Sequence, residues 1–165
     1  RVQLPGFRTL LSADMKYDLP KYLKNQANLE VKFKSVEDIV EFNKLDSLKR
    51  MPYNQVLFDG IVKDSTTLEE LEIIKTNLEN SGRIYFDSVI DSLKLDAFLS
   101  INNYHAGFAA VAKYPCLTVP MGFDKEGEPM NMTFIAKQFE EEKLLKIGYA
   151  FEKITNARKS PSNYN

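Results

Sequence analysis

The sequence predicts an α/β fold, and three observations lead to this prediction. The chain has 165 residues, of which 44% are hydrophobic and 27% are charged, a composition typical of ordinary globular proteins. Apolar residues recur at helical spacing through most of residues 1–94, whereas short apolar runs typical of strands begin at Leu95 and alternate with further helical patterns. We therefore expect a single region over residues 1–165: mainly helical over 1–94, strands plus helices over 95–158, and a tail over 159–165.

The first third of the chain predicts helices separated by a polar connection. Apolar residues up to Leu19 followed by Pro20 predict a broken helical region, because proline fits poorly inside a helix. Residues 25–35 are polar and predict a connection. Ser35 is then a suitable N-cap for a helix that ends at Pro52.

The next segment begins with a helix-start signal. Thr67 and Glu70 have the spacing of a capping box, and the apolar residues that follow lie on one helical face. The pair Ser81 and Gly82 predicts the end of that helix. A second helix is expected from Arg83 to about residue 92, and its predicted buried side consists of Ile84, Val89, Ile90 and Leu93.

The remaining residues predict strands interleaved with helices. Residues 95–101 predict a buried strand that ends at Asn102, and the small residues 106–112 predict a tightly packed helix. Residues 116–120 predict a strand with Pro120 at its end, because interior ladder positions need the N–H group.

Two further elements complete the pattern. A turn over residues 124–128 leads into a strand over 130–136, so these two strands are expected to pair antiparallel. A closing amphipathic helix begins in the acidic run Glu140–Glu142 and buries the apolar residues Leu144, Leu145, Ile147, Gly148, Phe151 and Ile154.

Composition excludes several classes of function. Lys and Arg number 22 against 23 Asp and Glu, giving a net charge of -1, so no nucleic-acid partner is expected. No apolar stretch approaches the roughly 20 residues that cross a bilayer, so no membrane partner is expected. The only cysteine, Cys116, and the only histidine, His105, provide neither a disulfide nor a multi-histidine metal site. We expect no metal and no cofactor, and the cellular location stays open.

Two residue sets are candidates for chemistry. Cys116 with His105 has the composition of a nucleophile and base, but Cys116 begins an apolar strand, where a thiol usually serves as a small hydrophobic side chain. Asn102, Asn103 and Tyr104 follow a buried strand, where α/β sheets often bind ligands, and are the candidate substrate-binding residues. The alternative is a local turn with the tyrosine packed on the next helix.

Three blocks resemble the amidase signature family. Residues 104–123 (YHAGFAAVAKYPCLTVPMGF) are similar to its small-residue helix and following strand, residues 128–137 (EPMNMTFIAK) to its next strand, and residues 142–161 (EKLLKIGYAFEKITNARKSP) to its closing helix. Upstream, residues 35–44 (SVEDIVEFNK) and 50–55 (RMPYNQ) resemble the peptide-amidase-like branch. The sequence departs from the family at Asn131, where glycine is usual, and at residues 100–103.

The resemblance implies the C-terminal part of the amidase-signature fold, a mixed sheet flanked by helices. It also implies hydrolysis of a small-molecule or peptide amide by a Ser-cisSer-Lys triad that lies outside this chain, so no catalytic residue is assigned here. The implied partner is the N-terminal half of the parent amidase. The alternatives are a fragment of a glutamyl-tRNA amidotransferase A subunit and a non-catalytic remnant or binding module.

Two expectations follow from this. The chain begins with Arg1, which fits a piece of a longer protein, processing, or a trimmed start. Taken alone, it is expected to be inactive and to self-associate through uncovered apolar surface or sheet edges.

Overall fold

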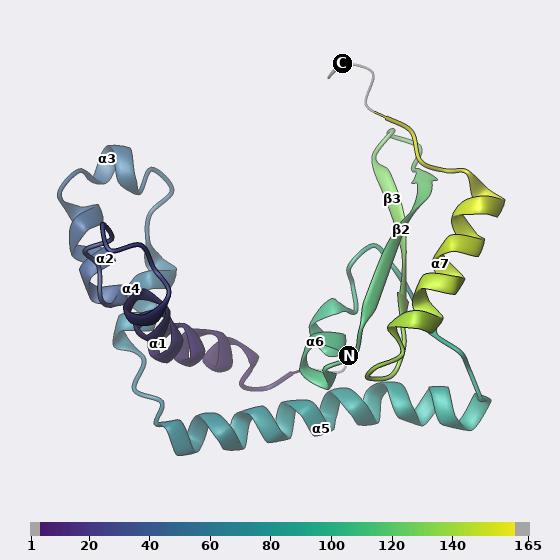
Figure 1. Ribbon diagram of the computed structural model, residues 1–165, viewed down its shortest axis with the longest axis horizontal. Helices are drawn as coiled ribbons and strands as arrows, with labels where there is room; N and C mark the ends of the chain where they lie inside the picture. The colour runs from purple at the N-terminus through teal and green to yellow at the C-terminus, as the bar shows by residue number, and fades with distance from the viewer. Residues whose placement is uncertain (1–3, 161–165) are drawn as a thin grey trace. The chain divides into compact units, whose positions relative to one another are not determined.

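The computed structural model describes residues 4–160. These residues form two compact units, divided between Asn77 and Leu78, and each is described by itself. The elements in chain order are α1 (Phe7–Asn25), α2 (Val36–Lys44), α3 (Ser47–Arg50), α4 (Val56–Lys63), α5 (Leu68–Leu93), β1 (Phe98–Ile101), α6 (Ala106–Ala112), β2 (Cys116–Phe123), β3 (Pro129–Ile135) and α7 (Glu141–Thr155) (Figure 1).

The first unit is helical, and its core lies between α1, α2 and α4. The buried residues are Val36, Val40 and Ile61, with Leu19, Phe58 and Val62 packed against them. Helix α4 was not predicted from the sequence. Gly60 lowers its helical propensity, and its formation depends on burial of its apolar side against α2.

Helix α1 continues through Pro20, so the predicted broken helix is wrong. The helix is held by contacts distant in sequence: Lys16 Nζ donates to Val62 O at 3.1 Å and Tyr17 OH donates to Thr66 O at 2.8 Å. Leu19 also packs against the core. These contacts outweigh the one backbone hydrogen bond that proline cannot donate.

The predicted N-cap of α2 is confirmed, because Asp38 N donates to Ser35 Oγ at 3.2 Å. The predicted end at Pro52 is wrong, since α2 ends at Lys44 and the short α3 follows. Arg50 explains the early end: its Nη1 donates to Phe42 O at 2.6 Å, and its guanidinium carbon lies 3.8 Å from the centroid of the Phe42 ring.

Helix α5 begins as predicted but does not end at Gly82. The capping box is confirmed, with Thr67 N donating to Glu70 Oε2 at 2.8 Å and Glu70 N to Thr67 Oγ1 at 3.2 Å. A Cβ at Gly82 would lie 2.8 Å from Val111 Cγ2 and 2.9 Å from Ala112 N. The glycine therefore permits close approach of α6 instead of ending the helix.

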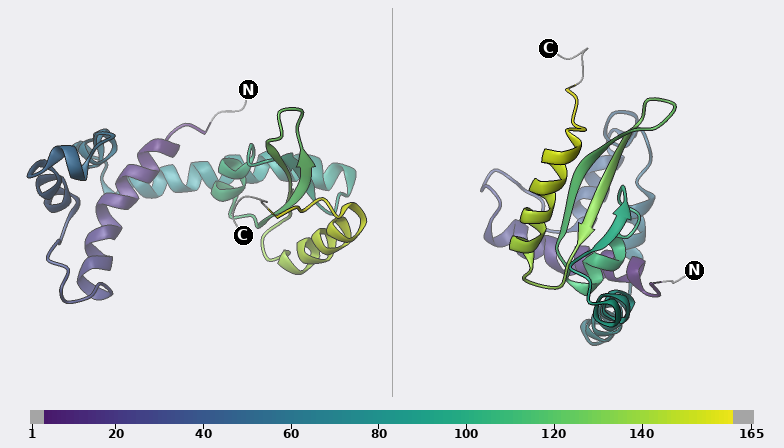
Figure 2. Two further views of the ribbon diagram at one scale, coloured as in Figure 1. Left: turned by 90° about the horizontal axis from the view of Figure 1, so that it is seen from above. Right: turned by 90° about the vertical axis from the view of Figure 1, so that its right-hand side faces the viewer.

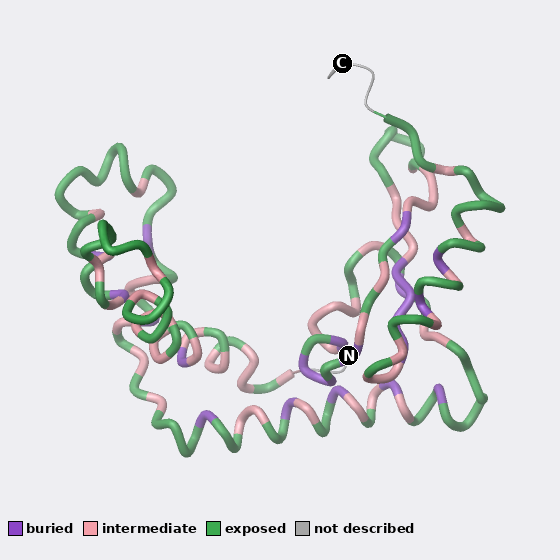
Figure 3. Tube along the Cα trace, viewed as in Figure 1, coloured by how far each residue is buried: buried purple, intermediate pink, exposed green. Residues whose placement is uncertain are grey.

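The predicted buried side of this helix is largely wrong. Ile90 is buried, but Ile84, Val89 and Leu93 are exposed. Within the second unit, the buried positions of the helix recur four residues apart along one side (Figure 3): they are Leu78, Gly82, Phe86 and Ile90.

The second unit contains a three-stranded sheet in the order β1-β3-β2, with both pairings antiparallel. The predicted hairpin is confirmed, since Asp124 Oδ1 accepts from Glu126 N at 3.0 Å and from Glu128 N at 2.8 Å. Pro120 lies inside β2 and not at its end. It is tolerated because β2 is an edge strand and its register shifts between Pro120 and Gly122.

Helices cover both faces of this sheet (Figures 1 and 2). Residues 78–93 of α5 and helix α6 cover one face, where the buried residues are Phe86, Ile90, Ala109, Ala112, Tyr114 and Ile135. Helix α7 covers the other, where they are Val119, Phe134, Ala136 and Leu144. The predicted α/β class and the helices α6 and α7 are confirmed, but Leu145 and Ile154, which were expected on the buried side of α7, are exposed. No helix among residues 4–160 has the length and hydropathy of a membrane span.

The predicted tail over 159–165 falls mostly on residues 161–165, which lie outside the described residues; residues 156–160 have no regular secondary structure.

Candidate functional site

A row of three hydroxyl groups crosses the sheet on the face covered by α6. Ser100, Thr133 and Thr118 are direct partners in the strand register. Thr133 Oγ1 donates to the carbonyl of Asn102, so the 2.8 Å contact between the two threonine hydroxyls must be donated by Thr118. Ser100 and Thr133 are only 3% and 1% exposed. Thr118 is exposed, so the row runs from the surface at β2 to the buried Thr133 and Ser100.

His105 connects this row to the start of α6. Its Nδ1 lies 2.8 Å from Ser100 Oγ. Its ring stacks on Tyr85 at 5.9 Å between centroids and contacts Phe98 edge-on at 5.2 Å. This distance suits a nucleophile and base, but a buried hydroxyl is out of reach of a substrate. The contact therefore positions α6 against β1.

The candidate pair of Cys116 with His105 is not formed. The hydrogen bond of His105 is to Ser100, whereas Cys116 Sγ contacts Tyr114 O at 3.9 Å. Desolvation by neighbouring atoms raises the pKa of the Cys116 thiol, which disfavours the reactive thiolate. The expectation that Cys116 is a buried hydrophobic side chain is also wrong, because the residue is exposed.

The candidate residues Asn102, Asn103 and Tyr104 lie in the turn directly after β1, and Asn102 extends the sheet. Its φ of 50° is left-handed. Asn102 N donates to Asn131 O at 2.8 Å, and its side-chain Oδ1 accepts from Asn131 N at 2.8 Å. The asparagine side chain thus satisfies a backbone group of β3 beyond the last residue of β1. Asn102 holds the turn and has little capacity left for a ligand.

Asn103 and Tyr104 differ from Asn102 in being presented to solvent. Tyr104 is 77% exposed, and Asn103 is also exposed. The backbone between them is fixed, because Tyr104 N donates to Ile101 O at 3.4 Å and Ala106 N donates to Asn103 O at 3.2 Å. Within residues 4–160 neither side chain has a hydrogen-bond partner. The turn therefore presents an amide and a phenol that are free to bind a ligand.

The hydroxyl row was not singled out as a site from the sequence. Thr118 and Thr133 lie on either side of the turn over residues 124–128. Once that turn fixes the hairpin register, the two threonines fall opposite each other. Ser100 offered no such signal, because the pairing of β1 with β3 is not local in the sequence.

The described part of the chain contains no set of side chains arranged to bind a metal ion. No group of three or more His, Cys, Asp or Glu side chains converges among residues 4–160. In the acidic run at the start of α7, Glu140 pairs with Lys143 at 2.7 Å, which lowers the pKa of Glu140. Glu142 pairs with Lys146 instead, so these two carboxylates have different partners and do not converge on one site.

Known amidases resemble this chain in sequence. The chain is 28% identical over 158 residues to an Arabidopsis thaliana protein named as a probable amidase, a match covering 94% of the chain and 30% of the relative. It is 21% identical over 171 residues to the A subunit of the glutamyl-tRNA(Gln) amidotransferase from Rhizobium etli, covering 90% of the chain and 35% of that protein. No protein-family model matches the chain.

Solved structures resemble the chain over a similar extent. An amidase family protein from Bacillus anthracis superimposes with a TM-score of 0.88 at 35% identity, covering 94% of this chain and 30% of that chain. The peptide amidase of Stenotrophomonas maltophilia superimposes with a TM-score of 0.83 at 25% identity, covering 96% and 35%. The chain spans about a third of the length of the proteins it matches.

Proposed function

Because the chain is a relative of the amidases in sequence and in fold, we propose that it is part of an enzyme that hydrolyses amide bonds. The single observation that carries the proposal is the likeness to an amidase family structure along almost the whole chain. Amide hydrolysis needs a nucleophile, a base and donors for the developing oxyanion. We place these in a Ser-cisSer-Lys triad elsewhere in the parent protein, so the N-terminal half of the parent is the partner of this chain.

In this proposal residues 1–165 form the C-terminal region of the amidase domain and supply one wall of the substrate pocket. Asn103 and Tyr104 contact a small-molecule or peptide amide. Asn102 and the Ser100–His105 hydrogen bond hold their turn in place. Support comes from the fixed backbone and unpaired side chains of this turn, since preorganised groups bind without a further ordering cost.

The activity is tested by measuring ammonia release from a blocked peptide amide and from a small acyl amide. We expect turnover by the full-length parent and none by the 165-residue chain, which without the triad provides no differential stabilisation of the transition state. Turnover by the chain alone that is abolished by Ser100→Ala or Cys116→Ala would contradict the placement of the triad.

The pocket wall is tested by substituting Tyr104 in the full-length parent. We expect Tyr104→Ala to raise KM about fivefold or more, because a desolvated aromatic contact contributes on the order of 1 kcal/mol to binding. Tyr22→Ala is the control, since Tyr22 is 52% exposed on α1 and is outside the proposed wall. Equal changes in KM for both variants would remove Tyr104 from the site.

The second candidate is part of a glutamyl-tRNA amidotransferase A subunit, favoured by the likeness over 90% of the chain. With a net charge of -1, the chain has no overall positive charge to attract tRNA. The two functions differ in the acceptor of the amide nitrogen. Release of free ammonia from a peptide amide supports the hydrolase, and transfer of the nitrogen to glutamyl-tRNA supports the amidotransferase.

A further inference from the structure

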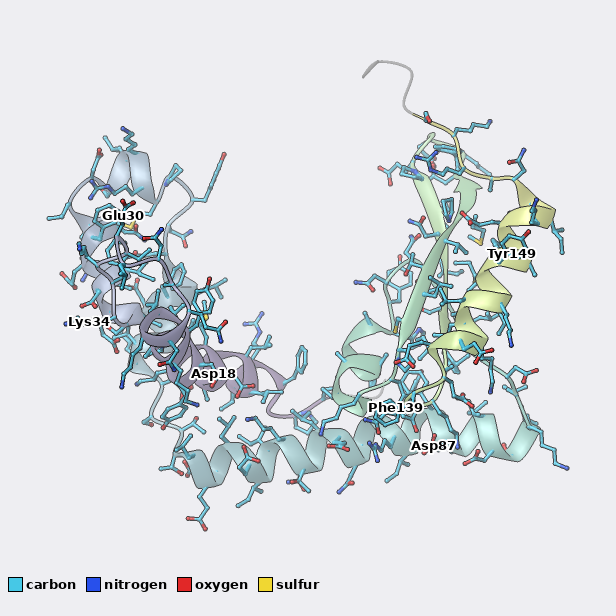
Figure 4. All side chains as sticks on the ribbon, viewed as in Figure 1. Asp18, Glu30, Lys34, Asp87, Phe139 and Tyr149 are labelled. Carbon is cyan, nitrogen blue, oxygen red and sulfur yellow. The ribbon has the colours of Figure 1, made fainter. Side chains whose placement is uncertain are left out.

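A hollow of about 370 Å³ lies beside the C-terminal end of α7. One flank of the helix forms its base, because the lining residues Tyr149, Glu152, Lys153 and Asn156 recur three and four positions apart. Pro120 of the edge strand β2 lines it from the sheet. Figure 4 labels Tyr149 on α7, and its side chain is 65% exposed. We refer to this hollow as the α7 pocket.

The turn after α7 brings an arginine to the rim of the pocket. Asn156 ends the helix with a left-handed φ of 44°, and its N–H donates to Glu152 O at 2.9 Å. The chain then turns. Arg158 therefore lines the same pocket as Lys153, which precedes Asn156 by about one turn of helix.

The cations at this end of α7 are not neutralised as the earlier ones are. Lys143 pairs with Glu140 at 2.7 Å, and Lys146 pairs with Glu142. Lys153 instead lies 5.7 Å from the centre of the Tyr149 ring. Arg158 has no ion pair within residues 4–160. Among the described residues 4–160, the pocket lining therefore carries two cations without an ion pair and one carboxylate, that of Glu152.

We propose that the α7 pocket binds a small organic anion through a carboxylate or phosphate group. Arg158 would hold two oxygens of that group with its planar fork, and Lys153 would add a point charge. The ring of Tyr149 offers an apolar contact for the organic part. The volume lies within the range of small-ligand pockets.

The negative end of the α7 helix dipole lies at this pocket and opposes the binding of an anion, but it corresponds to only about half an elementary charge. The site does not depend on amide hydrolysis.

The test is a titration of the full chain with a small anion. Binding is monitored through the NMR chemical shifts of the backbone amides of residues 149–158. Glutarate probes the carboxylate source and phenyl phosphate the phosphate source. We expect saturable shifts confined to the pocket with one of the two probes, weakened several-fold by added salt. Absence of saturation with both probes at about 10 mM would overturn the proposal.

Substitutions separate a built pocket from general attraction to surface cations. Arg158→Gln should weaken binding about tenfold by removing the fork, and Lys153→Gln should weaken it less. Lys146→Gln is the matched control on the same helix, because Lys146 is paired and outside the pocket. Binding weakened equally by Lys146→Gln would also overturn the proposal. All three side chains are on the surface, so unchanged thermal unfolding verifies that the variants fold.

Discussion

At the scale of single residues, Gly82 shows how one missing methyl group determines the packing of two helices. A Cβ at this position would lie 2.8 Å from Val111 Cγ2 and 2.9 Å from Phe108 O. Overpacking costs about 1–3 kcal/mol, and alanine recovers up to about 1 kcal/mol in helical propensity. Gly82→Ala is therefore expected to lower the free energy of unfolding by up to about 2 kcal/mol, measured by urea denaturation.

Gly60 provides the control for this prediction. It also lies inside a helix, but a Cβ there would meet nothing within 4 Å. Gly60→Ala is expected to stabilise the chain by about 0.5–1 kcal/mol. A stabilising Gly82→Ala would show that the two helices have room to separate.

A second residue-scale prediction concerns the hydroxyl of Tyr114, which donates to Asp87 Oδ1 at 2.6 Å. Burial, and after it the hydrogen bond to Asp87, raises the pKa of Tyr114 well above its ordinary value of 10.0. The unfolded phenol therefore ionises first as pH rises. The stability from this residue is complete below the ordinary pKa and is lost as the pH rises above it.

The measurement compares the wild type with Tyr114→Phe by urea denaturation at about pH 8 and about pH 11. The variant should be less stable by about 1–2 kcal/mol at the lower pH, because a hydrogen bond to a carboxylate is lost. The difference should shrink at the higher pH. Tyr22→Phe controls for general alkaline effects, and a difference that grows with pH would contradict the raised pKa.

At the scale of elements, the start of α5 depends on its capping box. Thr67→Ala removes the Oγ1 that accepts from Glu70 N and should destabilise the chain by about 0.5–2 kcal/mol. Thr76→Ala on the same helix is the matched control. Thr76 Oγ1 donates to Glu72 O within the helix, and alanine there is expected to be neutral or stabilising. Equal losses in thermal unfolding would remove the capping explanation.

The same capping box predicts that the stability of the chain depends on pH in the acid range. The Thr67 backbone N–H, followed by its hydroxyl, lowers the pKa of Glu70. Because the pKa of Glu70 is lower in the folded chain, its carboxylate stabilises the fold at a pH above its ordinary pKa. This contribution to stability is lost as the pH falls through the folded-state pKa. The stability difference between wild type and Thr67→Ala should thus narrow at low pH but not vanish, because protonation of Glu70 weakens the bond from the Thr67 hydroxyl to the carboxylate and leaves the bond from Glu70 N to Thr67 Oγ1 intact. Thermal unfolding across an acid series measures this.

At the scale of the whole molecule, the sheet leaves β1 exposed at one edge. Leu99 and Ile101 are 55% and 47% exposed, and α7 packs mainly against β2 and β3. An uncovered apolar edge strand is a template for pairing with another chain. We expect the isolated chain to self-associate, with an average mass in light scattering that rises with concentration.

The variant Leu99→Lys should shift this association toward the monomer, because a charge on an edge strand opposes pairing. Leu145→Lys is the control, since Leu145 is 63% exposed but lies on α7 away from the edge. A monomer at all concentrations, or equal effects of both variants, would contradict association through β1.

Much of the fold is predictable from local signals in the sequence. The caps at Ser35 and Thr67, the hairpin turn, and the helices α6 and α7 depend on residues within a few positions of one another, and all are confirmed. The resemblance to amidases that the three sequence blocks indicate is confirmed, because the chain is similar to amidases in both sequence and structure. The turn containing Asn103 and Tyr104 is predictable from its position after a strand, whereas its contact with a substrate stays a prediction.

Only the tertiary structure decided the rest, because the deciding contacts join residues far apart in the chain. Helix α1 passes Pro20 and α5 passes Gly82 since packing partners distant in sequence outweigh the local breaking signals. The difference between Asn102, which completes the sheet, and Tyr104, which faces solvent, depends on the pairing with Asn131. A local pattern specifies hydrogen bonds within a turn, whereas burial depends on which distant surfaces meet.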